Sequence, residues 1–267
     1  MMLKILVPSL IACVCSVNSA FAACHYPLDA TPQDYDDLAT FPFIKNTDQT
    51  VTAQIQASPS FEINYTALSH QVAQDTLASK GPFGDMLIPS TGIVALEMAQ
   101  SMPLPTPTAP GAIWSFPQVL LDLGTQNPKG FENYILVTFT MINGGMAPQP
   151  SPQLIVSAQG TGERFATTVQ KIPLTLPLSN YRFGLYLNQD RKKIGVTVNG
   201  TDYGYFSHTL FTRHISKVAV KLGLSEGKIQ ATDPIVGKTI DFSLITDASQ
   251  MSHTYPKGAM DMCGTVI

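Results

Sequence analysis

The feature that most constrains the fold is a stretch of alternating apolar and polar residues from Tyr181 to Phe206, YRFGLYLNQDRKKIGVTVNGTDYGYF. Alternation with a period of two is typical of a half-buried strand, because successive side chains point to opposite faces of a sheet. The dipeptide Asn199-Gly200 predicts a two-residue hairpin turn, which needs positive φ at both positions. The stretch therefore predicts three consecutive antiparallel strands.

Similar strand patterns recur along most of the chain. They are found at 50–56, 92–100, 115–124, 132–142, 152–159, 164–172, 215–224 and 238–246. Many short strands separated by turns rich in glycine and proline are typical of two antiparallel sheets packed face to face. We therefore predict an all-β fold, a two-sheet antiparallel β-sandwich of the jelly-roll type.

At most one short helix is expected among these strands, within Thr66–Ser79. Leu68, Val72 and Ala73 recur there at helical spacing. The proline-rich segment 101–111 has strand patterns on both sides, which favours a strap within one domain over a domain boundary. Residues 23–267 are therefore predicted to form a single β-sandwich domain.

Residues 1–22 have the pattern of a secretory signal peptide. Lys4 supplies the basic start, an apolar run follows, and Ala20-Phe21-Ala22 forms a small-x-small cleavage signal. No later segment approaches the roughly 18 unbroken apolar residues that a membrane-spanning helix needs. We predict cleavage near Ala22 and a secreted or periplasmic protein without a transmembrane segment.

Removal of this leader leaves two cysteines, Cys24 and Cys263. An even pair in an oxidising compartment indicates a disulfide. The alternative is a lipoprotein anchored through Cys24, because Phe21-Ala22-Ala23-Cys24 has small residues before the cysteine, as in a lipid-attachment signal. The anchor would leave Cys263 unpaired, so the sequence favours the disulfide.

The charge balance excludes one class of partner. The chain has 16 basic and 19 acidic residues, a formal net charge of −3. Proteins that bind nucleic acid neutralise phosphates with clustered lysine and arginine. We therefore expect no nucleic-acid partner.

The register of the three-stranded stretch assigns its two faces. Pairing Leu187 with Ile194 gathers the apolar residues of the first two strands on one core face. Counting through the hairpin turn then places Tyr203 opposite Val196 and Tyr205 opposite Ile194. Both tyrosines are therefore expected on the core face.

The opposite face combines one aromatic ring with bare backbone. Tyr186 lies beside a predicted Gly195–Gly204 pair, and glycine inside a strand often marks a place where a ligand or another backbone comes close. An aromatic ring can equally cover such glycines within the sheet itself. If the face binds a ligand, the candidate binding residues are Tyr186, Arg182, Thr197, Asn199, Asp202, Gly195 and Gly204.

Three segments carry a resemblance to a known family: RFGLYL at 182–187, KKIGVTVNGTDYG at 192–204 and GKTIDFSLITD at 237–247. They resemble the hairpin and closing strand of concanavalin A-like lectin and glucanase sandwiches, which include laminin-G and SPRY modules. The whole mature chain is similar to a small bacterial family of secreted proteins of unknown function with this fold. The resemblance implies glycan binding only by analogy of fold.

The catalytic carboxylates of such glucanases are missing. Glycoside cleavage by a retaining enzyme needs two carboxyl groups about 5 Å apart, on one strand face in a Glu-x-Asp pattern. The five glutamates are Glu62, Glu97, Glu132, Glu163 and Glu226, and none has an aspartate two residues later. The metal motif of legume-type lectins is also missing, so we predict no metal and no cofactor.

The sequence thus favours a secreted or periplasmic, non-catalytic β-sandwich that binds a glycan or another cell-surface component. The alternative is a structural, assembly or adhesion protein that acts through protein–protein contacts. A third hypothesis is a glycoside hydrolase whose acid pair comes from distant strands. The ligand and the oligomeric state stay open.

Overall fold

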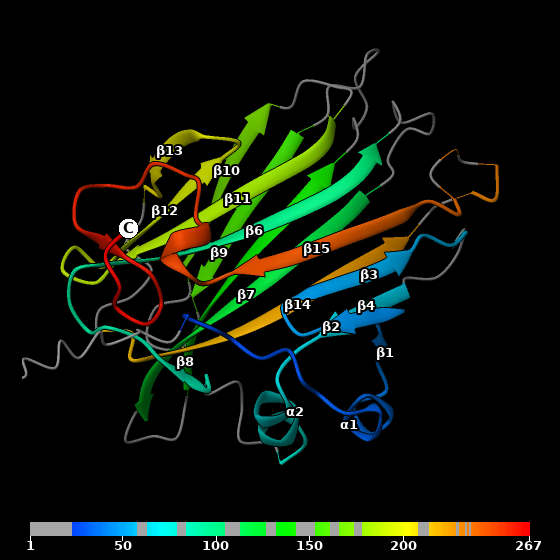
Figure 1. Cartoon of the computed structure of the whole chain (residues 1–267), viewed down its shortest axis with the longest axis horizontal. Coiled ribbons are helices and arrows are strands. Elements are labelled where there is room, and N and C mark those ends of the chain that lie inside the picture. The colour runs from blue at the N-terminus through cyan, green and yellow to red at the C-terminus, as the bar shows by residue number, and fades with distance from the viewer. Residues whose placement is uncertain are drawn as a thin grey trace, which may run out of the picture.

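In the computed structural model of this chain, two layers of β-strands lie face to face (Figure 1). The structure describes residues 23–57, 63–78, 84–104, 113–126, 132–142, 153–160, 166–173, 178–207, 214–227, 230–232, 234 and 236–267. The predicted signal peptide, 1–22, and most of the proline-rich segment lie outside the described residues. Within the described part of the chain, no helix combines the length and the apolar character needed to cross a membrane.

The first layer, sheet A, has the strand order β1-β4-β14-β7-β8-β9-β10, with β5 paired to β14. The strands are β1 Phe41–Pro42, β4 Ile63–Ala67, β5 Met86–Leu87, β7 Ile113–Gln126, β8 Glu132–Ile142, β9 Gln153–Gly160, β10 Ala166–Pro173 and β14 Lys217–Gly227. All pairs in this sheet are antiparallel except β1 with β4.

The second layer, sheet B, has the order β13-β12-β11-β6-β15-β3-β2, with β16 paired to β6. Its strands are β2 Lys45–Thr47, β3 Thr50–Gln54, β6 Ile93–Leu104, β11 Leu178–Asn188, β12 Lys193–Val198, β13 Thr201–Tyr205, β15 Thr239–Ile245 and β16 Ala259–Met260. Neighbours such as β11, β6 and β15 are far apart in sequence, because the chain passes repeatedly between the two layers. The predicted all-β, two-sheet jelly-roll sandwich is confirmed.

Both sheets contribute to one core. Phe183 of β11, Leu96 of β6 and Phe242 of β15 pack from sheet B, and Val220 and Leu222 of β14 pack from sheet A. The pairing predicted for β11 and β12 is confirmed, because Leu187 is the register partner of Ile194. The alternate residues of β11, β6 and β15 therefore point away from the core.

The register of β13 differs from the prediction. Tyr205 is the partner of Gly195, and the register shifts between Gly195 and Thr197. Gly204 has a φ of 74° and donates its backbone N–H to Asp202 Oδ1 at 2.8 Å. Such a bulge sets two residues of β13 opposite one of β12 and shifts every later residue by one position.

Two outcomes follow from this bulge. Tyr203 packs against the core as predicted. The prediction that Tyr205 lies on the core face is wrong, since its ring contacts Tyr186 on the outer face at a centroid distance of 5.2 Å. The predicted Gly195–Gly204 pair is also absent from the register.

Two short helices, α1 Pro32–Asp37 and α2 His70–Leu77, pack near β14 of sheet A. The helix predicted within 66–79 is present from His70, with Ser69 as its N-cap, whereas β4 ends at Ala67. The helix α1 was not predicted, although Thr31 and Asp34 form a capping box, which is a readable start signal.

A buried carboxylate joins the two helices. Asp34 is 1% exposed and accepts hydrogen bonds from the Thr31 backbone and hydroxyl, from His70 Nδ1 at 2.7 Å and from Gln74 Nε2 at 2.6 Å. Burial alone raises the pKa of Asp34, but these hydrogen bonds outweigh it and hold the pKa well below its usual range.

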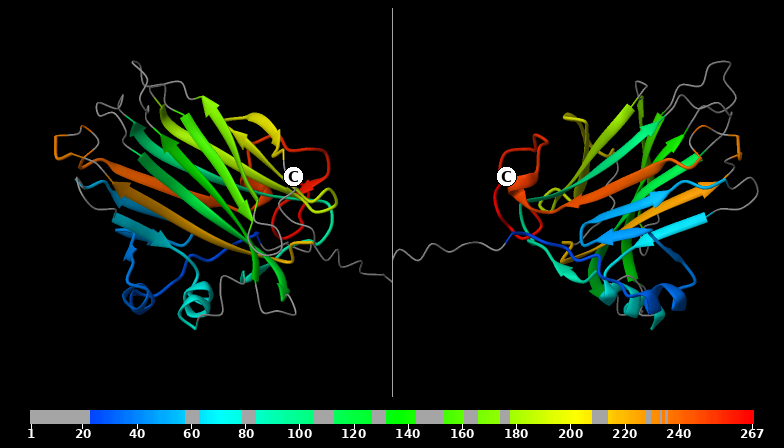
Figure 2. Two further views of the ribbon diagram at one scale, coloured as in Figure 1. Left: turned by 180° about the vertical axis from the view of Figure 1, so that it is seen from behind. Right: turned by 45° about the vertical axis from the view of Figure 1, so that its right-hand side comes forward.

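The two ends of the described chain are covalently joined. Cys24 and Cys263 form a disulfide with a Cα–Cα distance of 5.6 Å across a sequence separation of 239. Figure 2 shows the blue N-terminal segment passing beside the red C-terminal segment. The predicted disulfide is confirmed.

Candidate functional site

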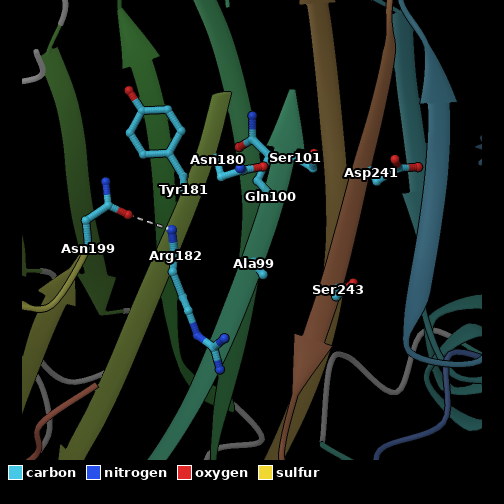
Figure 3. Close-up of a pocket in the computed structure, with 9 residues that line it drawn as sticks. All are labelled: Ala99, Gln100, Ser101, Asn180, Tyr181, Arg182, Asn199, Asp241 and Ser243. Carbon is cyan, nitrogen blue, oxygen red and sulfur yellow. Dashed lines mark hydrogen bonds between the residues drawn. The ribbon is translucent and has the colours of Figure 1, made fainter. Parts of the chain in front are cut away.

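The outer face of sheet B carries a polar hollow where β11, β6 and β15 lie side by side. The register brings Arg182 of β11 opposite Ala99 of β6, and Ala99 opposite Ser243 of β15. One row further along the strands, Asn180, Ser101 and Asp241 are aligned in the same way. The hollow has a volume of about 320 Å³ and is lined by Ala99, Gln100, Ser101, Asn180, Tyr181, Arg182, Asn199, Asp241 and Ser243 (Figure 3). We call it the Arg182 hollow.

Hydrogen bonds hold the polar groups of this hollow in place. Asn199 Oδ1 accepts from the Arg182 backbone N–H at 2.8 Å, the dashed line in Figure 3. Asp241 accepts from the Thr52 hydroxyl at 2.6 Å. Asp241 and Asn199 thus border the hollow from opposite sides, and hydrogen bonds hold the carboxylate and the amide in position.

The Arg182 guanidinium is matched by a buried carboxylate. Its Nε donates to Oε2 of Glu97, whose side chain is fully buried, and its Nη2 donates to the Gln250 carbonyl. A buried charge is costly unless it is paired and hydrogen-bonded, so this ion pair holds both groups in one geometry. The positive charge of Arg182 is therefore largely compensated before any ligand arrives.

The same carboxylate holds the C-terminal segment against the sheet. Glu97 Oε1 accepts from the backbone N–H groups of Ser252 at 3.0 Å and His253 at 2.8 Å, and from the Tyr255 hydroxyl at 3.1 Å. His253 Nδ1 in turn accepts from the Gly200 N–H at 3.1 Å. The residues from Gln250, the last of the 3₁₀ helix η1 Ala248–Gln250, to Tyr255 therefore lie beside the hollow, and His253 and Tyr255 pack over Gly184 of β11.

Burial changes the titration of two groups in this segment. It lowers the pKa of His253, although the Glu97 charge opposes this shift. It also raises the pKa of the Tyr255 hydroxyl, and the nearby Glu97 charge adds to that effect.

Tyr186 occupies the space that the sequence analysis assigned to a ligand. The side chain is buried, its hydroxyl donates to Asp202 at 2.8 Å, and its ring meets Tyr205 and Tyr255 edge-on. A Cβ added at Gly195 would overlap the Cζ, Cε2 and Oη atoms of Tyr186. Gly195 therefore makes room for the ring of the protein itself.

The structure divides the seven predicted binding residues into three places. Arg182 and Asn199 line the hollow. The next group, Tyr186, Thr197 and Gly195, is buried in the described structure. The last two, Asp202 and Gly204, lie on the edge strand β13. Ligand binding by any of them stays a prediction.

Sequence reasoning did not find the other polar residues of the hollow, Asn180, Ser101, Asp241 and Ser243. Asp241 and Ser243 are outward positions of a strand that the sequence does signal, whereas Ser101 and Asn180 lie just outside the predicted strands. The strands β6 and β11 extend far enough to include them. Their grouping depends on β6 pairing with both β11 and β15, and no local pattern encodes those partners.

Among the described residues, one group of side chains is close enough to share a metal ion: Cys24, Asp261 and Cys263. Both cysteines are in the disulfide, and Asp261 accepts backbone hydrogen bonds from Cys263 and Thr265 at 2.9 Å each. The disulfide and these hydrogen bonds therefore explain why the three side chains lie close together.

Comparison with known proteins gives one family match. Residues 154–265 match the family model described as a domain of unknown function, DUF4882. The match covers less than half of the 267 residues. No curated protein matches the chain.

Several solved structures resemble this one. Alginate lyase A1-II′, a member of polysaccharide lyase family 7, has a TM-score of 0.40 at 13% identity, covering 73% of this chain and 75% of its own. Alginate lyase AlyC3 in complex with dimannuronate has a TM-score of 0.41 at 7% identity, covering 73% and 71%. Sheep galectin-11 in complex with glycerol has a TM-score of 0.33 at 12% identity, covering 59% and 94%.

These matches correct the function predicted from the sequence. The prediction of a non-catalytic sandwich is contradicted, because the similar structures include polysaccharide lyases as well as a galectin. The missing glucanase motif excluded one catalytic arrangement only. The general resemblance in fold to lectin-like jelly-roll sandwiches is supported.

Proposed function

We propose that this protein is carbohydrate-active and holds part of a glycan chain in the Arg182 hollow. The observation that carries the proposal is the hollow itself, whose lining includes the carboxylate of Asp241, the amides of Asn180 and Asn199 and the hydroxyls of Ser101 and Ser243. Sugars present many hydroxyl groups, and sites that recognise them need several fixed donors and acceptors in one place. The register of three strands supplies that arrangement on a rigid sheet.

A catalytic role at this site would belong to Asp241. It is the single carboxylate among the described residues that line the hollow, and a carboxylate facing a bound sugar can act as a general base. Glu97 is fully buried and bonded to Arg182, Ser252, His253 and Tyr255, so it cannot serve as a second acid. Hydrolysis by a carboxylate pair therefore has no second partner in the described part of the hollow.

A secreted or periplasmic location would suit this role, since polysaccharides of the cell surface lie outside the cytoplasm. The resemblance of the β11–β12 hairpin to concanavalin A-like lectins and glucanases is compatible with it, and so is a single sandwich domain after residue 22. The leader and the domain boundary stay predictions.

The experiment compares binding and turnover in the mature protein and two tryptophan variants. Ser101→Trp places a large ring inside the hollow, whereas Ser207→Trp places the same ring at an exposed serine after the far end of β13. Calorimetric titration with soluble oligosaccharides measures binding, and the release of new chain ends from a polysaccharide panel measures turnover. Alginate belongs in that panel because similar structures are alginate lyases.

We expect Ser101→Trp to lose binding and any turnover, while Ser207→Trp behaves as the unsubstituted protein. If turnover is found, Asp241→Asn should abolish it. Absence of both binding and turnover across the panel, or equal effects of the two tryptophans, would contradict the proposal.

A further inference from the structure

The charges at the Arg182 hollow limit which glycans it can take. Among the described lining residues, Arg182 is the single cation and Asp241 the single anion. Arg182 is paired with the buried Glu97, whereas no ion pair of Asp241 is found in the described structure. The hollow therefore offers one uncompensated negative charge to a ligand.

The neighbouring groups add hydroxyls without adding a cation close to Asp241. Thr52 donates to Asp241, and Thr50 shares a hydrogen bond of 3.1 Å with Ser243 on the same face. The next strand outward brings Lys45 into register with Thr52, two strands away from Asp241. Two strand separations put the backbones of Lys45 and Asp241 about 9.6 Å apart, and no ion pair between these two residues is found in the described structure.

A carboxylate in this setting favours hydroxyl groups and disfavours anions. An ionised aspartate is an acceptor only, and sugar hydroxyls are donors that it can accept. A uronic acid or a sulfated sugar in the same place would bring a second negative charge against Asp241, while the guanidinium that could receive it already bonds Glu97 and Gln250. The hollow is thus built for ligands without acidic groups.

We infer that the Arg182 hollow binds a neutral glycan, one without carboxylate or sulfate groups, and that Asp241 is the residue that selects against acidic ones. This inference rests on the proposed function. It differs from what the similar structures would suggest, since alginate is built of uronic acids.

The test is a paired titration of the mature, disulfide-bonded protein. One arm uses neutral gluco-, manno- and xylo-oligosaccharides, and the other uses oligoalginate and oligogalacturonate. Each arm is repeated with Asp241→Asn, which keeps the shape and removes the charge, and with the Ser101→Trp and Ser207→Trp pair. Thermal melts of all variants check that each one is folded.

We expect a neutral oligosaccharide to bind, Ser101→Trp to block it, and Asp241→Asn to weaken it about tenfold or more, the scale of a lost hydrogen bond to a charged group. Asp241→Asn should at the same time strengthen whatever weak binding the acidic arm shows. That gain is the outcome that a merely structural role of Asp241 would not produce.

The failures of the two proposals can be told apart. Binding of acidic oligosaccharides equal to or tighter than neutral ones, blocked by Ser101→Trp, would overturn this inference and leave the proposed function intact. No binding in either arm, or binding that Ser101→Trp does not change, would overturn the proposed function and this inference with it.

Discussion

Gly195→Ala tests directly whether the glycine of β12 makes room for the Tyr186 ring. The added Cβ would overlap three atoms of that ring, whereas carbon atoms in good contact lie about 3.5 to 4.0 Å apart. The ring cannot swing away freely, because its hydroxyl donates to Asp202 and its edges pack on Tyr205 and Tyr255. The variant must therefore strain the sheet or displace Tyr186.

The size of the effect follows from these contacts. Overpacking a buried site costs about 1 to 3 kcal/mol, and losing the Tyr186–Asp202 hydrogen bond adds about 0.5 to 1.5 kcal/mol. We expect Gly195→Ala to lower the free energy of unfolding by about 1.5 to 4.5 kcal/mol. For a chain of this length that corresponds to a fall in Tm of roughly 3 to 18 °C.

The assay is a double-mutant cycle measured by denaturant unfolding. In a Tyr186→Ala background the ring is gone, so Gly195→Ala should no longer lower the free energy of unfolding. The coupling free energy between the two substitutions should then equal the cost of Gly195→Ala in the parent protein. Gly223→Ala on β14 is the matched control, because its Cβ would meet only the Tyr65 carbonyl oxygen, at 3.7 Å. That variant should be neutral or more stable by up to about 1 kcal/mol.

Two results would refute the reasoning. If Gly195→Ala cost less than about 0.5 kcal/mol, the ring would not be confined as the structure shows. If it cost the same with and without the Tyr186 ring, the clash would lie with some other group.

Three further predictions address the ends, the core and the helices. Replacing Cys24 and Cys263 together by serine should lower stability by up to about 5 kcal/mol for a loop of 239 residues, and alkylation without reduction should leave the intact mass of the parent protein unchanged. Val196→Asp should unfold the protein in a thermal melt, because Val196 is fully buried in the core; an unchanged Tm would contradict the face assignment of β12. Asp34→Asn should destabilise the protein at neutral pH, because hydrogen bonds such as that from His70 hold the pKa of Asp34 low in the folded state only. The difference in unfolding free energy between the variant and the parent should therefore shrink as the pH falls below 3.8. Denaturant midpoints across this pH range give the measurement.

Local patterns determined the fold class and much of the β11–β12 hairpin. A period of two dictates which residues share a face, so Leu187 and Ile194 had to lie together once the turn was placed. The disulfide was readable for a different reason, since removal of the predicted leader would leave Cys24 and Cys263 as the two cysteines. Neither conclusion required knowledge of which strands are neighbours.

The register of β13 depends on a feature that alternation does not encode. Strict alternation from the turn puts Tyr205 opposite Ile194, but Gly204 adopts a positive φ beside Asp202 and Tyr205 pairs with Gly195 instead. A single inserted bulge then moves Tyr205 to the other face of the sheet, and a turn motif does not specify it.

The candidate site depended almost wholly on the tertiary structure. Ser101 and Asp241 are 140 residues apart in the chain and become neighbours only because β6 pairs with β15. Tyr186 is buried because the C-terminal segment, held by Glu97, covers a face that alternation alone marks as exposed. Side-chain direction is a local property of a strand, whereas the partners of that strand and the segments that cover it are set by the packing of the whole chain.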